Sequence, residues 1–123
     1  MQKENKNLII SRQSLEDPWK ESMKLKKIFT HLLRHHVCEE DWHADKVADL
    51  CTAYTLAHHY NLIATNLYET ETYKGDPPEG LRGKGECVEV SRDEIIKFGQ
   101  IAITLTTLCI SLVESYGISL ELH

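Results

Sequence analysis

The sequence predicts an all-α fold, with one shorter amino-terminal helix followed by a long antiparallel helical hairpin. Three long segments carry apolar residues at helical spacing. Two of them begin with residues that typically cap a helix, and one ends at a glycine. Between the second and third segments, "KGDPPEGLRGKGECVEV" contains four glycines and two prolines, a composition typical of a loop.

The first predicted helix covers residues 18–36. Asp17 is suited to the N-cap, Pro18 to the first helical position, and Glu21 to the first turn, where acidic side chains favour the helix dipole. Residues 1–16 precede these signals and carry Lys3, Lys6 and Arg12, so we expect a flexible basic segment there. Residues 17–123 are then a single helical domain, as the short chain length suggests.

The second predicted helix covers residues 41–72, because no glycine or proline interrupts the chain from Asp41 to Lys74. Its apolar residues form two adjacent stripes, which indicates neighbours on two sides. The loop then covers residues 73–90, and its end, 87–90, is a candidate for a brief extended piece.

The third predicted helix covers residues 92–116. Ser91 and Glu94 match a capping box, and Gly117 occupies the position where a left-handed residue ends a helix. No charged residue occurs from Phe98 to Val113, so this helix is apolar on most of its sides.

A unit of three helices cannot surround such a helix, so we expect a homo-oligomer in which a second chain covers part of it. The predicted interface consists of Ile101, Leu105, Leu108 and Leu112. The alternative is a monomeric bundle whose threonine and serine hydroxyls face water and bond back to helix carbonyls.

Composition indicates a globular protein: 41% of the residues are hydrophobic, 27% are charged, and the net charge is −5. The amino-terminal segment lacks the apolar core of a signal peptide. The apolar stretch in the third helix is interrupted by polar residues and is shorter than the roughly 20 residues that span a bilayer. The four cysteines contain no C-x-x-C spacing. We therefore expect a cytoplasmic protein with reduced cysteines and no membrane contact.

Charge is distributed unevenly along the chain. Residues 1–35 hold eight lysines and arginines against four acids, and the remaining residues hold six against fifteen. Such asymmetry favours an anionic partner for the basic end, although a solvated helix face has the same composition. The candidate DNA-binding residues lie on the first helix: Lys20, Lys24, Lys26, Lys27 and Arg34.

Histidines and acids are the candidates for a metal site. His31 and His35 are one helical turn apart, with Cys38 and His43 nearby, but no H-E-x-x-H or paired-cysteine motif accompanies them. We therefore predict that no metal or other cofactor binds.

An acidic ladder along one face of the second helix is a possible Mg²⁺ site, as in nucleotide pyrophosphohydrolases that resemble MazG. Its members are Asp41, Asp45 and Asp49. Those enzymes need a second acidic motif on a neighbouring helix, whereas the last helix offers only Glu94 and Glu114 at opposite ends. We predict no catalytic residues, with this hydrolase as a third alternative for the function.

The order of these parts resembles the small terminase subunit of tailed bacteriophages, of the P27-like kind. Trp19 lies on the first helix, an acidic segment with Asp41 or Asp45 follows, and "CTAYTLAHHY" matches the core of the long helix. After the glycine-rich loop, "YGIS" matches the ending of the last helix. Two departures are "VSRDE" in place of the family's "NP", and "LELH" without the usual proline or arginine.

The resemblance implies a ring-forming, non-enzymatic protein in the host bacterial cytoplasm. Such a protein recognises viral duplex DNA at the packaging site and passes it to the large terminase subunit. The alternative from a different class is a small helical interaction module, such as a phage-encoded inhibitor that binds a host protein through its acidic surface.

Overall fold

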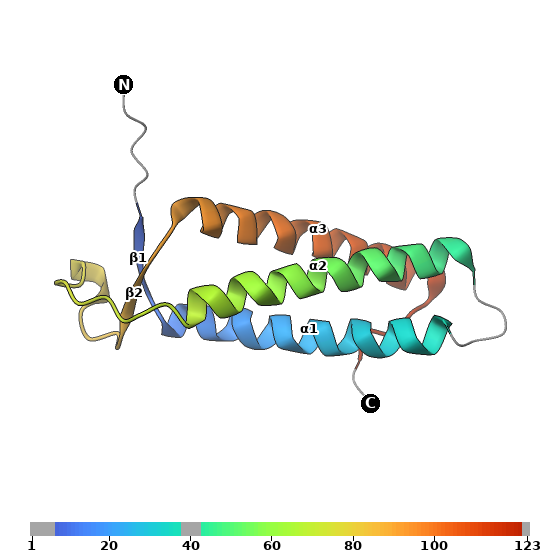
Figure 1. The fold of residues 1–123 in the computed structure, drawn as a ribbon, viewed down its shortest axis with the longest axis horizontal. Coiled ribbons are helices and arrows are strands. Elements are labelled where there is room, and N and C mark those ends of the chain that lie inside the picture. Colours follow the sequence, from blue (N-terminus) through green and yellow to red (C-terminus); the bar gives the residue numbers. More distant parts are fainter. Residues whose placement is uncertain (1–6, 38–42, 122–123) are drawn as a thin grey trace, which may run out of the picture.

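The computed structural model describes residues 7–37 and 43–121, and it contains three helices side by side with a two-stranded sheet at one end (Figure 1). The predicted all-α class is confirmed. Each helix has 25 residues. In chain order the elements are β1 (Leu8–Ser11), α1 (Gln13–Val37), α2 (Ala44–Tyr68), a short 3-10 turn (Glu79–Leu81), β2 (Cys87–Val90) and α3 (Arg92–Tyr116).

The amino-terminal end differs from the prediction. Residues 1–6 lie outside the described residues, and residues 8–11 form a strand within the segment that was expected to be flexible. β1 pairs antiparallel with β2, with Leu8 opposite Val90. α1 then begins at Gln13, so Pro18 lies inside the helix and not at its start. Tertiary contacts outweigh the local start signals, because Leu15 is buried against β2 and the end of α2.

α2 ends at Tyr68, four residues before the predicted end, and its predicted start at Asp41 lies outside the described residues. Arg12, between β1 and α1, accounts for the early end. Its guanidinium donates to the carbonyl oxygens of Tyr68 at 2.5 Å and Thr70 at 2.7 Å. These carbonyls at the helix end would otherwise lack partners, so Arg12 stabilises the point at which the chain leaves the helix.

α3 has the bounds and caps that the sequence predicts. The Ser91 hydroxyl accepts the N–H of Glu94 at 3.4 Å. At the other end Gly117 has a φ of 64°, and its N–H donates to the Val113 carbonyl at 2.9 Å. The chain then turns back toward α1 and α2, and Ile118 is buried among them.

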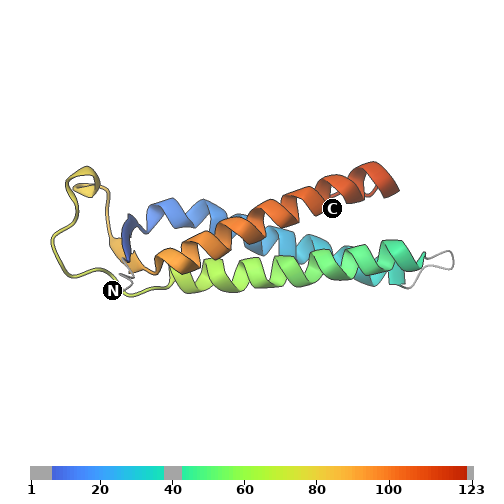
Figure 2. The same ribbon diagram turned by 90° about the horizontal axis from the view of Figure 1, so that it is seen from above.

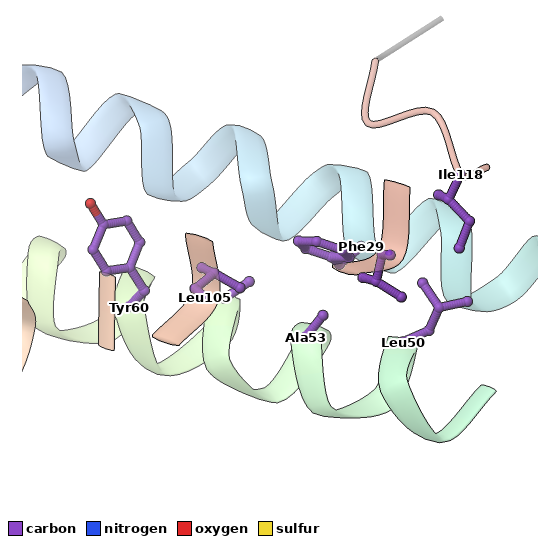
Figure 3. Packing of buried hydrophobic residues seen from close by; sticks show 8 residues of the cluster. Phe29, Leu50, Ala53, Tyr60, Leu105 and Ile118 are labelled. Carbon is purple, nitrogen blue, oxygen red and sulfur yellow. The ribbon is translucent and has the colours of Figure 1, made fainter. Parts of the chain in front are cut away.

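The main core lies where α1 and α3 both pack against α2, and Figure 3 shows its buried side chains converging between the helices. Phe29 of α1 is fully buried at the centre. The other members are Leu50, Ala53, Ala57, Tyr60, Leu105, Leu112 and Ile118. A second cluster fills the sheet end and consists of Leu15, Leu67, Val88 and Val90. The extended piece predicted at residues 87–90 is therefore confirmed as β2, and it completes this cluster.

α3 is the least covered helix. It runs at an angle across α2 (Figure 2), and only Leu105 and Leu112 among its residues are buried. By length and composition alone, α3 would be able to cross a bilayer. This finding differs from the expectation that the apolar stretch of α3 is too short to span a bilayer.

Candidate nucleic-acid interface

Three of the five predicted DNA-binding residues lie together in one groove. Lys26, Lys27 and Arg34 line a hollow of about 540 Å³ on the side of α1 that meets α2. The remaining lining residues are Met23, Thr30, His31 and Asn61. The groove is open and elongated along α1, so it suits an extended charged ligand better than an enclosed small molecule.

Helical spacing explains why these residues share a side of α1. Lys27 and Arg34 are seven residues apart, which returns the side chain to nearly the same direction after two turns. Phe29 points into the core instead and fixes the rotation of α1 against α2. Burial of this ring therefore determines which lysines face outward along the groove.

The polar floor of the groove is held by contacts within the protein. The Asn61 side chain donates from Nδ2 to the Ser22 hydroxyl at 3.1 Å. Ser22 is fully buried and donates to the Trp19 carbonyl at 2.6 Å. The Thr30 hydroxyl donates to the Lys26 carbonyl at 2.7 Å. These bonds fix the neutral groups, so the cationic ends of the lysines and arginine determine what the groove attracts.

The electrostatic surroundings of the groove are positive. No aspartate or glutamate occurs on α1 from residue 22 to 37, or on the part of α2 from residue 50 to 68. His31 and His35 stack at the same end, with ring centroids 6.3 Å apart. Three cations beside stretches of α1 and α2 that hold no acid favour an anionic ligand, even in a chain of net charge −5.

Lys20 and Lys24 do not belong to this groove. The Lys20 ammonium lies 2.8 Å from the Glu16 carboxylate, and this hydrogen bond raises the pKa of Lys20. Lys24 lies with Glu21 along a different groove, between α1 and α3. The structure thus separates the predicted set into a clustered group of three and two lysines with acidic neighbours.

Sequence reasoning missed Thr30 and Asn61. Thr30 follows from helical spacing, since it lies one turn from Lys26 and Arg34. Asn61 belongs to another helix, and its position beside α1 depends on how the two helices pack.

The structure corrects the residues expected at an oligomer interface. Leu105 and Leu112 are buried within the single chain, and Ile101 and Leu108 pack against the same core. A lysine at position 105 would therefore disrupt the subunit itself rather than only an assembly. The helix is apolar on nearly all sides, so its periodicity did not reveal which side faces α2.

The other candidate sites are dispersed. His31, His35 and His43 are exposed, whereas Cys38 lies outside the described residues. In the acidic ladder, Asp45 is exposed and Asp49 accepts a hydrogen bond from the Tyr116 hydroxyl at 3.0 Å. Across residues 7–37 and 43–121, no three histidine, cysteine, aspartate or glutamate side chains are grouped closely enough to hold a metal ion.

No protein-family model, curated protein or solved structure matches this chain.

Proposed function

We propose that this chain is a non-enzymatic DNA-binding protein with the role of a small terminase subunit in phage DNA packaging. The observation that supports the proposal is the groove lined by Lys26, Lys27 and Arg34, which faces no acid on the adjoining parts of α1 and α2. Lysine and arginine side chains spaced along a helix meet phosphates without reading the bases. The groove therefore suits the backbone of duplex DNA.

Three cations per chain give weak binding, so the function requires a homo-oligomer. An assembly repeats the groove once per chain, so several weak contacts act on the same DNA molecule. The affinity of the assembly for DNA is then much higher than that of one chain. The ring and the transfer of DNA to the large terminase subunit come from the resemblance of the chain to small terminase subunits. Neither a catalytic residue nor a cofactor takes part in this function.

The test compares two charge-reversed double variants in binding to labelled duplex DNA at several salt concentrations. Lys27→Glu with Arg34→Glu removes two cations of the groove, and we expect much weaker binding. The log–log salt dependence becomes shallower by about 0.9 for each phosphate that the protein no longer neutralises. Lys20→Glu with Lys74→Glu changes the net charge equally at two exposed positions outside both grooves, and we expect a much smaller effect.

Two results would overturn the proposal. Equal weakening in the two double variants would show that overall charge, and not the groove, attracts DNA. Failure of the parent protein to retain duplex DNA at about 50 mM salt, where phosphate contacts are strong, would remove direct DNA binding altogether.

A further inference from the structure

Four exposed apolar side chains form a continuous stripe along the outer side of α3. Ile103 is 70% exposed, Ile110 53%, Ile96 48% and Val113 44%. Monomeric proteins rarely leave an apolar surface of this length uncovered. The stripe lies on a different side of α3 from Leu105 and Leu112, which face the core.

The stripe has a seven-residue repeat. Isoleucines recur at every seventh position, and each is followed three residues later by a smaller residue. The isoleucines are Ile96, Ile103 and Ile110, and the smaller residues are Gly99, Thr106 and Val113. In a coiled coil, each helix packs against its partner through two positions in every seven residues. These two positions are separated alternately by three and four residues.

The repeat is self-complementary when two copies of α3 run antiparallel. In that register Gly99 of one copy faces Ile110 of the other, and Thr106 faces Ile103. Each isoleucine then contacts a smaller residue of the partner. At both ends of the paired region, Ile96 of one copy packs against Val113 of the other. The space above Gly99 is open, with no atom within 4 Å of where a Cβ would lie, so an isoleucine from a second chain has room there.

A groove beside the stripe extends the surface onto α1. It holds about 340 Å³ between α1 and α3, and Tyr60 of α2 contributes to its lining. Its apolar wall on α1 consists of Leu25 and Ile28, and Ile110 belongs to both the groove and the stripe. A stable dimer buries about 800 Å² of each partner. The contact of two helices over roughly 25 Å is narrow, and the groove supplies additional area.

Charges favour the antiparallel orientation. Glu114 is the charged residue at the end of the stripe, and a parallel pair would place two copies of it side by side. In the antiparallel pair Glu114 meets the amino-terminal end of the partner's helix, where the helix dipole is positive. That end also carries Lys97 and Arg92, which balance Asp93 and Glu94.

We propose that α3 pairs with α3 of a second copy of this chain, antiparallel, through this stripe and groove. The inference rests on the proposed function in one respect, because that function requires an oligomer. It further implies that any larger assembly contains an even number of chains. The basic groove lies on another side of α1 and stays open in the pair, since none of its lining residues belongs to the α1–α3 groove.

The first test is the mass of the full chain in solution, by sedimentation equilibrium over a range of concentrations. The parent is expected at twice the chain mass of 14.2 kDa or at a larger even multiple of it. Ile103→Glu places an unpaired charge in the stripe and should weaken association by about a hundredfold or more. Thr104→Glu adds the same charge one residue away, on an exposed side of α3 outside the stripe, and should leave the mass unchanged.

The second test reports the register and does not depend on a disruptive variant. Ile96→Cys and Val113→Cys are made singly and together, and each protein is oxidised gently. The two positions are roughly 25 Å apart in one helix, so they can form a disulfide only between chains. If the two helices pair antiparallel, a disulfide between chains forms in the double variant and in neither single variant. The parent protein controls for links through its own cysteines.

A parent that stays monomeric at about 100 μM, or single variants that link as well as the double variant, would overturn the inference. Flotation of a monomeric parent with vesicles of zwitterionic and anionic phospholipid would assign the stripe to a membrane and would overturn it as well. These readouts are separate from DNA binding. A dimer that does not bind DNA therefore contradicts only the proposed function. A DNA-binding oligomer whose Ile96→Cys and Val113→Cys double variant does not link contradicts only the pairing.

Discussion

A side-chain hydrogen bond joins α2 to each of the other two helices. Apolar packing alone would let one helix shift along another. Asn61 of α2 donates to the buried Ser22 of α1, and Tyr116 at the end of α3 donates to Asp49 at the start of α2. The Tyr116 pKa is raised above its ordinary value of 10.0, mainly because the hydroxyl donates this hydrogen bond and additionally because of desolvation. Such bonds set the position of one helix along another.

Replacement of this hydroxyl gives a pH-dependent prediction. Tyr116→Phe should lower the thermal unfolding midpoint near neutral pH, because Asp49 loses its donor. Since folding raises the Tyr116 pKa, the stabilisation is complete below pH 10 and is lost as the pH rises through the folded pKa. The midpoints of parent and variant should therefore converge in alkaline solution. Persistence of the full difference at high pH would contradict the assignment.

At the scale of the element, α3 is defined by its ends. Ser91 begins it and Gly117 ends it in the left-handed conformation, after which the chain turns back so that Ile118 reaches the core. A helix with few buried residues depends on such caps more than a helix that is fully surrounded.

Gly117→Ala should lower the free energy of unfolding by about 1 kcal/mol, because a side chain disfavours the left-handed conformation. No atom lies within 4 Å of the added Cβ, so the cost comes from the backbone alone. Gly80→Ala is the matched control, since its Cβ also meets open space and its φ is not in the left-handed region. Urea unfolding measures both, and equal stability of the two variants would contradict the role of Gly117 as the helix end.

At the scale of the whole molecule, one chain forms an incomplete bundle. α1 and α3 pack on α2 from two sides, and the apolar stripe of α3 together with the groove beside α1 remains uncovered. Pairing then stabilises the folded chain, because the pair buries apolar surface that a single chain exposes to water.

This coupling predicts that thermal stability depends on protein concentration. For a dimer that unfolds to two chains, each tenfold increase in concentration should raise the midpoint by about 2–4 °C. Ile103→Glu should abolish the dependence while keeping the helical circular dichroism of the parent. A midpoint of the parent that does not move with concentration would contradict the coupling.

Features that depend on atoms within a few residues of one another could be predicted from the amino-acid sequence. The caps of α3 at Ser91 and Gly117 and the loop after α2 are local, and they were predicted correctly. Hydrogen bonds of one helical turn and the conformational freedom of glycine are properties of short segments. They hold whatever the rest of the chain does.

Features that depend on residues far apart in the chain follow from the packing of the helices and strands. Asp17 and Pro18 form a good local helix start, yet α1 begins at Gln13, because β1 pairs with β2 and draws Leu15 into the second cluster. The side of α3 that faces α2, and the meeting of Asn61 with the basic groove, likewise come from packing between helices. A helix that is apolar on several sides has several rotations of similar local energy, and burial against the other helices selects one of them.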